Sequence, residues 1–175
     1  MGVYGLGNIG SRVAAIAHAF GMHVISPTSK AAEAIAPYVR KVTFEQMLAE
    51  ADVITIHAPL TQQTRGLFGA AAFAAMKRTA VLINTARGPI VDESALAEAL
   101  RSGTIAGAAV DVLATEPPTA ACPLLAADLT GGDTPRLLIT PHIAWQSVTA
   151  RHRLLQVSVA NLAAFLAGHP QNRVN

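Results

Sequence analysis

Short apolar runs alternate with stretches of helical periodicity along most of the 175-residue chain. Apolar runs bounded by turn residues predict buried strands, and apolar residues spaced three and four apart predict helices with one buried face. Regular alternation of the two predicts an α/β fold, a doubly wound parallel sheet with an added C-terminal helix. Asp92 and Gly103 are suitable residues to begin and end the helix between them. The expected strands are 2–4, 23–26, 40–42, 53–57, 80–84, 106–112 and 137–140, and the expected helices are 8–20, 44–49, 70–76, 93–102 and 146–167.

A glycine-rich motif, GLGNIG at residues 5–10, lies between the first expected strand and the first expected helix. In a G-x-G-x-x-G motif at this place, Gly5 permits a tight turn and Gly7 lets backbone N–H groups approach a pyrophosphate. Gly10 lets the helix pack closely on the strand, and the helix N-terminus offers partial positive charge to phosphates. The motif alone is a weak signal. Between a strand and a helix it predicts a Rossmann-type dinucleotide-binding domain.

Three further motifs follow expected strands and carry an arginine, a glutamate and a histidine. Ligands of open α/β sheets bind outside the carboxyl ends of the strands, so Arg87, Glu116 and His142 are expected beside one nucleotide site. An arginine fork can hold a substrate carboxylate with two hydrogen bonds. A histidine can donate a proton to a carbonyl oxygen, and a nearby glutamate raises the pKa of that imidazole.

The order of the motifs GLGNIG, INTARGPIVDESAL, DVLATEPP and ITPHIAW resembles the D-isomer-specific 2-hydroxyacid dehydrogenase family across nearly the whole chain. The PHIAW motif, and EPP followed by residues 122–125, most resemble its glycerate dehydrogenase/hydroxypyruvate reductase branch. The resemblance implies NAD(P)-dependent hydride transfer to a small 2-keto acid, giving a D-2-hydroxy acid. Hydroxypyruvate/D-glycerate and glyoxylate/glycolate are the favoured pairs.

The resemblance also implies roles for individual residues. Arg87 would bind the substrate carboxylate and carbonyl, and Glu116 and His142 would form the acid/base pair. Formate dehydrogenases of the same superfamily have glutamine in place of this glutamate, which speaks against that activity. The implied cofactor contacts, besides Gly5, Gly7 and Gly10, are Asn8, Ile9, Ala58, Pro59, Thr85, Ala86, Arg87, Asp111, His142 and Trp145.

One departure concerns the choice of cofactor. Family members that use NAD usually end the second strand with an acidic residue, which binds the ribose 2′-OH. Here Thr28 stands at that place, followed by Ser29 and Lys30. No carboxylate there would repel a 2′-phosphate, and Ser29 and Lys30 can hold one. We therefore predict NADP(H) preference, or weak discrimination between NAD and NADP.

Several of these residues also have a purely structural interpretation. Asp111 can cap a strand end as readily as contact the nicotinamide side. Trp145 can cover a core, although its place after the histidine motif indicates the mouth of the substrate site. His57 ends an apolar strand, and a structural or cofactor-lining role is favoured over catalysis there.

Composition and charge limit the classes of partner that the chain can bind. The chain is 51% hydrophobic and 14% charged, which suits a buried sheet covered by helices and argues against disorder. Its net charge of +2 is scattered, without the basic stripe that nucleic-acid binding requires. Segment 154–166 is too short and too polar to span a bilayer. No nucleic acid and no membrane are thus expected as partners, and the resemblance implies a small 2-keto or 2-hydroxy acid as the substrate.

Cys122 is the single cysteine, which excludes an internal disulfide and fits a reducing cytoplasm. No His, Cys, Asp or Glu set has metal-ligand spacing, so no metal is expected. The proline-rich stretch 115–135 is expected to be a long, functional loop.

The domain expectation is a dinucleotide-binding domain at 1–145 and a C-terminal helix at 146–175. The resemblance implies a substrate lobe built mostly before the first strand, which this chain would lack and on which the helix would pack. Turnover by the chain alone is therefore expected to be slight. The alternative function is a non-catalytic dinucleotide-binding or dimerisation module, and a homodimer is expected in either case.

Overall fold

The computed structural model describes residues 1–125, 129 and 136–174. The chain divides into two compact units, Met1–Pro141 and His142–Asn175. The expected domain boundary, after residue 145, lies a few residues beyond this division.

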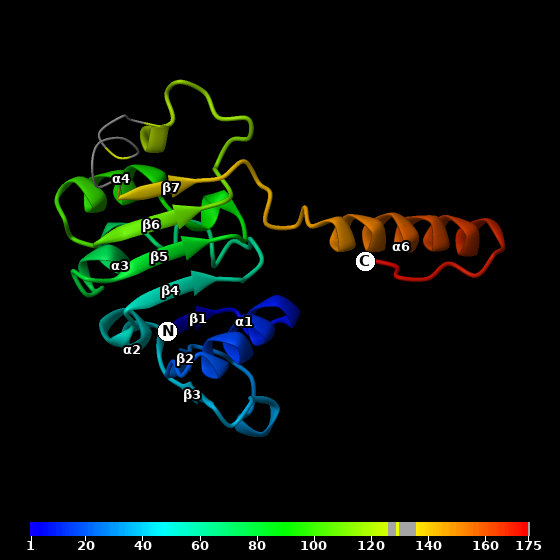
Figure 1. Ribbon diagram of the computed structural model, residues 1–175, viewed down its shortest axis with the longest axis horizontal. Helices are drawn as coiled ribbons and strands as arrows, with labels where there is room; N and C mark the ends of the chain where they lie inside the picture. The colour runs from blue at the N-terminus through cyan, green and yellow to red at the C-terminus, as the bar shows by residue number, and fades with distance from the viewer. Residues whose placement is uncertain (126–128, 130–135, 175) are drawn as a thin grey trace. The chain divides into compact units, whose positions relative to one another are not determined.

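The first unit is built on one parallel sheet, which has seven strands in the described part of the chain (Figure 1). The strand order is β3-β2-β1-β4-β5-β6-β7, so the direction of winding reverses between β1 and β4. A reversal of this kind leaves a crevice at the carboxyl ends of the two central strands. The strands are β1 (Gly2–Tyr4), β2 (Val24–Ser26), β3 (Val39–Lys41), β4 (Val53–Ile56), β5 (Val81–Asn84), β6 (Gly107–Val110) and β7 (Leu137–Ile139).

Helices cover the sheet on both faces, as a doubly wound fold requires. Successive residues of a strand point to opposite faces. Val3 of β1 packs with Ala14 and Ala17, which belong to α1 (Asn8–Ala19). A side chain on neighbouring Gly2 would instead meet Met47, which belongs to α2 (Phe44–Glu50). The prediction of a doubly wound parallel sheet is thus confirmed.

The larger core lies on the α2 side, where α3 (Ala70–Ala74) and α4 (Glu93–Arg101) also pack. Each large aliphatic side chain that becomes fully buried there contributes about 1.5–3 kcal/mol. The rings of Tyr4, Phe44 and Phe68 pack edge to face, with centroids 5.5 to 5.7 Å apart. Aromatic packing and aliphatic burial together hold the central strands in place.

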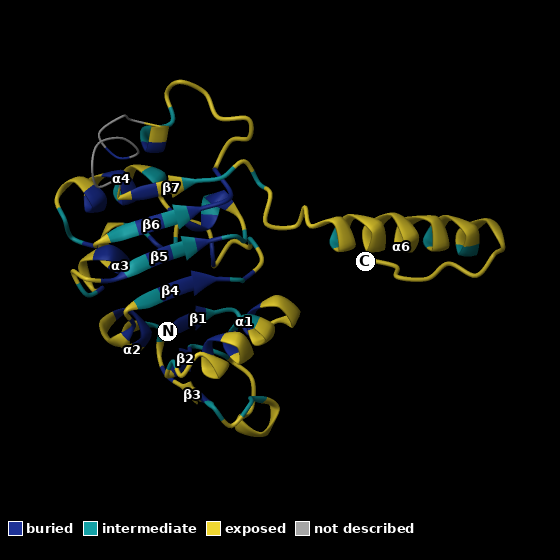
Figure 2. Ribbon diagram, in the orientation of Figure 1, coloured by how far each residue is buried: buried dark blue, intermediate teal, exposed yellow. Residues whose placement is uncertain are grey.

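The opposite face of β5, β6 and β7 is covered less completely (Figure 2). Leu82 and Val110 are buried against the large core, whereas Ile83 and Ala109 are half-buried. Leu138 of β7 is 62% exposed. One face of the sheet is therefore less buried than the other at this end.

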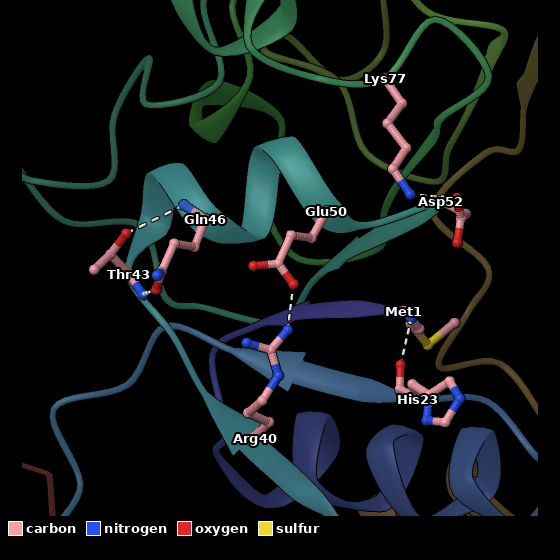
Figure 3. Close-up of polar contacts among 8 residues, drawn as sticks. All are labelled: Met1, His23, Arg40, Thr43, Gln46, Glu50, Asp52 and Lys77. Carbon is pink, nitrogen blue, oxygen red and sulfur yellow. Dashed lines mark hydrogen bonds and ion pairs between the residues drawn. The ribbon is translucent and has the colours of Figure 1, made fainter.

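Local signals define several helix ends. Thr43 accepts a hydrogen bond from the Gln46 N–H and the Gln46 side chain returns one to the Thr43 N–H, a capping box (Figure 3). Asp92 caps α4 by accepting from the Ala95 N–H at 3.0 Å, and Gly103 follows the helix with φ +69°. The predicted start and stop of α4 are confirmed.

Three short 3₁₀ helices in the described residues were not predicted. They are η1 (Ala32–Ala34), η2 (Gly88–Ile90) and η3 (Pro123–Leu125). The last lies within the expected loop 115–135 and buries Leu124, so that stretch is partly ordered by the core. The rest of the loop at 126–128 and 130–135 lies outside the described residues.

The second unit consists mainly of α6 (Val148–Leu166), which Ser147 caps by accepting from the Ala150 N–H at 3.2 Å. The helix begins two residues later than predicted. None of its 19 residues, all within the described chain, is buried. Asn172 donates to the side-chain oxygen of Asn161 at 2.8 Å and ties the following tail to the helix. Among the described helices, none has the length and apolar character needed to cross a membrane.

Candidate dinucleotide site

The glycine motif forms the turn between β1 and α1, and each glycine has a distinct task. Gly5 has φ +97°, a conformation that other residues rarely adopt, and a Cβ there would lie 2.7 Å from the Ala58 nitrogen. A Cβ on Gly10 would overlap the carbonyl oxygen of Gly5. Gly7 is exposed and a Cβ there would meet nothing within 4 Å. The outer glycines thus shape the turn, while the middle one leaves it open to a ligand.

The N-terminus of α1 faces this turn without a protein cap. Gly7 is the N-cap residue and makes no side-chain hydrogen bond to the helix. The first N–H groups of an α-helix have no partner within the helix, and the helix dipole makes this end attractive to anions. Asn8 and Ile9, the first two helical residues, are exposed. The turn therefore fits the pyrophosphate of a dinucleotide.

A pocket of about 380 Å³ adjoins the glycine turn. The lining joins the turn to the loop after β2 and to the end of β4, and it contains the predicted residues Thr28, Ser29, Lys30 and Ala58. Among the described residues that line it, Lys30 is charged and none is acidic. The Lys30 ammonium donates to the carbonyl oxygen of Leu6 at 2.6 Å, so it lies directly beside the turn.

A second pocket, of about 490 Å³, shares Ala58 with the first. Arg87 therefore lies in a pocket with four other residues that were expected to contact the cofactor beyond the glycine turn. The lining residues are Ile9, His57, Ala58, Pro59, Leu60, Thr85, Ala86 and Arg87.

Asn84, at the end of β5, shapes the turn that presents Arg87. Its buried side chain donates to the Arg87 carbonyl oxygen and accepts from the Ala86 N–H, each at 3.0 Å. Arg87 itself is exposed, and its guanidinium donates to the Ala86 carbonyl oxygen at 2.6 Å. The sequence analysis assigned Asn84 no role. The signal that could have indicated its role is a polar residue at the end of an apolar strand, directly before the arginine motif.

Glu116 lies in a loop that packs against the Arg87 loop. Its carboxylate accepts from the Leu113 N–H at 2.8 Å, and Glu93 of α4 accepts from the Ala114 N–H at 2.6 Å. A Cβ on Gly88 would overlap the backbone of Leu113 and Ala114. The loops that carry Arg87 and Glu116 therefore touch backbone to backbone. Glu93 was not anticipated, because its partner is far away in sequence.

Asp111 and His57 occupy structural positions in the first unit. Asp111 is buried and accepts from the Thr140 hydroxyl at 2.5 Å, which links the ends of β6 and β7. The His57 ring lies 2.9 Å from the Thr55 hydroxyl, and partial burial lowers the pKa of its imidazole. Nicotinamide contact by Asp111 and cofactor lining by His57 stay predictions.

His142 and Trp145 belong to the second unit, so their places relative to Arg87 and Glu116 stay predictions. His142 has φ +55°, and the side chain of Trp145 is 47% exposed. The Gln146 N–H donates to the Ile143 carbonyl at 2.9 Å, forming a turn just before α6.

Comparison with known proteins identifies the family of a chain with this fold and these pockets. Residues 1–144 match the model of the D-isomer specific 2-hydroxyacid dehydrogenase, NAD binding domain. This chain belongs to that family. The resemblance inferred from the motifs and the Rossmann fold are both confirmed.

Three relatives illustrate the match. Glycerate dehydrogenase of Methylorubrum extorquens is 45% identical, over 99% of this chain and 52% of that enzyme. Hydroxypyruvate reductase of Blautia hydrogenotrophica is 38% identical, over 100% of this chain and 52% of that enzyme. The NAD-complexed D-isomer specific 2-hydroxyacid dehydrogenase of Lactobacillus delbrueckii ssp. bulgaricus superposes with a TM-score of 0.85 and 34% identity, over 99% of this chain and 55% of that one. The chain therefore spans about half the length of the curated relatives it matches.

Proposed function

We propose that this chain provides the cofactor-binding part of an NAD(P)-dependent D-2-hydroxyacid dehydrogenase. The observation that carries the proposal is the pair of pockets sharing Ala58, one against the open glycine turn and the other containing Arg87. A dinucleotide spans such a pair when its pyrophosphate lies at the helix N-terminus between them. When bound, NAD(P) supplies or accepts the hydride.

The residues around the cofactor then divide the work. Arg87 holds the substrate carboxylate through its planar guanidinium, which presents parallel N–H donors. His142 gives a proton to the keto oxygen, and Glu116 orients the imidazole for that transfer. Contact between the Arg87 and Glu116 loops supports placing these two residues at one site. The nearness of His142 is part of the proposal.

The preferred cofactor is NADP(H). The lining around Thr28, Ser29 and Lys30 carries a positive charge and, among the described residues, no carboxylate to repel a 2′-phosphate. For the substrate we propose hydroxypyruvate or glyoxylate. The similarity to a glycerate dehydrogenase and a hydroxypyruvate reductase supports hydroxypyruvate, and the similarity to a glyoxylate reductase of Aeropyrum pernix supports glyoxylate. The arginine in the second pocket suits the carboxylate of either acid.

Titration of the purified chain with NADPH and NADH, followed by the fluorescence of the reduced nicotinamide, tests cofactor binding. We expect both to bind, NADPH more tightly. Gly7→Asn is the matched variant, because its side chain enters open space and asparagine is a favoured N-cap. The variant should stay folded, as judged by circular dichroism, and lose cofactor affinity. Equal affinity of the variant and the natural chain would contradict the proposed site.

Activity is tested by following NADPH oxidation with hydroxypyruvate and with glyoxylate. Turnover that Arg87→Lys lowers mainly through a higher KM supports the dehydrogenase proposal, because lysine keeps the charge but loses the planar fork. Because the chain alone is expected to turn over slowly, the assay is repeated after mixing it with a separately expressed substrate lobe. Cofactor binding without turnover in that mixture supports a binding module instead.

We further propose that the chain forms a homodimer. Its exposed large apolar side chains include Phe20, which follows α1 directly, and Leu155, Leu162 and Phe165 on α6. Apolar surface of this kind promotes association. Sedimentation at several concentrations tests this, and a monomer throughout would refute it. The cytoplasmic location expected from the single cysteine stays a prediction.

A further inference from the structure

The loop after β2 is held from two sides by lysines. The Lys30 ammonium donates to the Leu6 carbonyl at 2.6 Å, and the Lys41 ammonium donates to the Lys30 carbonyl at 2.8 Å. Within the loop, the Lys30 N–H donates to the Thr28 hydroxyl at 3.2 Å. Lys41 therefore brings a second positive charge to a segment that lines the first pocket.

The place of Lys41 follows from the register of the sheet. Lys41 is the last residue of β3 and pairs with Ser26, the last residue of β2. Both strands end at the same edge, so the Lys41 side chain can reach the loop that continues from Ser26. Its neighbour Arg40 points to the other face, where it pairs with Glu50 (Figure 3).

The partners of these two lysines leave their charge available. Both ammonium groups donate to neutral backbone carbonyls, and within the described chain neither forms an ion pair with a carboxylate. Each ammonium carries three N–H donors, so one backbone contact leaves donors for an anion. Both side chains belong to exposed residues, where a phosphate can reach them.

We propose that Lys41 is a specificity-determining residue that, with Lys30 and Ser29, binds the 2′-phosphate of NADP(H). The inference rests on the proposed function, because it needs the adenosine end of a dinucleotide in the first pocket. Lys41 adds a cation from β3 to the phosphate-binding residues predicted in the Thr28–Lys30 segment. Lys41 acts directly on the phosphate rather than only by holding the loop.

The test compares dissociation constants for NADPH and NADH in the natural chain, Lys41→Gln and Lys41→Arg. Lys77 forms an ion pair with Asp52 at 2.8 Å (Figure 3). Lys77→Gln is the control variant, because it changes the net charge by the same amount as Lys41→Gln. We expect Lys41→Gln to weaken NADPH binding about three- to tenfold, as for loss of one exposed charge contact, and to leave NADH binding unchanged. Lys41→Arg should keep the preference for NADPH, and Lys77→Gln should not alter it.

Other outcomes separate the inference from the proposed function. Equal weakening of both cofactors in Lys41→Gln would reduce Lys41 to a support for the loop and overturn the inference. Equal affinity of the natural chain for NADPH and NADH would overturn it as well, while tight binding of both would leave the dinucleotide site standing. Binding of neither cofactor would overturn both proposals.

Discussion

The glycine turn and the paired Arg87 and Glu116 loops reach the same end of the sheet by different means. The turn is shaped mainly by close backbone contacts at Gly5 and Gly10, whereas Gly7 is left open. The paired loops depend on side chains, Asn84 under one and Glu93 under the other. The turn leaves no room for a side chain at Gly5 or Gly10, whereas the paired loops depend on hydrogen bonds that can be removed singly. Four substitutions or conditions separate the two.

The largest effect is expected at Gly10. In Gly10→Ala, the new methyl group overlaps the Gly5 carbonyl oxygen, and neither can turn aside because the backbone fixes the position of both. We expect the free energy of unfolding to fall by about 2–3 kcal/mol. Urea unfolding measures this, with Gly7→Asn as the comparison, for which a change below about 1 kcal/mol is expected. Similar losses in the two variants would show that the outer and middle glycines do not differ as described.

Asn84→Ala should rank second. The change removes two hydrogen bonds and leaves the Ala86 N–H and the Arg87 carbonyl without this partner in a half-buried turn. We expect a loss of about 2 kcal/mol in the free energy of unfolding, together with weaker substrate binding because Arg87 is displaced. Asn84→Asp keeps the acceptor for the Ala86 N–H and should therefore lose less stability than Asn84→Ala. Unchanged stability in Asn84→Ala would show that the turn does not depend on the Asn84 hydrogen bonds.

Glu93→Ala is expected to have a smaller effect, of about 1 kcal/mol, because its contact with the Ala114 N–H is exposed. The Glu93 carboxylate also accepts from the Cys122 thiol at 3.7 Å. Loss of Glu93 should therefore make Cys122 react faster with iodoacetamide. Glu93→Gln keeps an acceptor and serves as the control, and equal thiol reactivity in all three proteins would contradict the link.

The smallest effect is a pH dependence at His57. Partial burial lowers the pKa of the folded imidazole below its ordinary value of 6.5, so the unfolded chain binds more protons in this window. The contribution of His57 to stability is complete above 6.5 and is lost as the pH falls from there toward the folded pKa. The free energy of unfolding should thus decline less steeply below that pH in His57→Gln than in the natural chain. Parallel pH profiles would show that burial does not act on this ring.

The sequence predicted best what depends on neighbours along the chain. All seven strands of the described residues and the start and stop of α4 were anticipated, since the apolar period and capping chemistry act within a few residues. The glycine motif was also recognisable, because its three conformational demands fall within six residues. Family membership followed from the order of four such motifs.

Tertiary structure decided what depends on distant partners. Only the folded turn distinguishes Asn84 from other residues at strand ends. Glu93 contacts Ala114, and Lys41 contacts Lys30 beyond the neighbouring strand, so both partners are distant in sequence. The half-exposed face of β5 and β6 likewise depends on which helices cover the sheet. Local sequence determines what a segment can form, whereas a contact between segments requires both to be folded at once. For this reason the sequence was enough to predict a dinucleotide-binding fold. Only the folded sheet shows that the lysines and loops of the site meet at one edge.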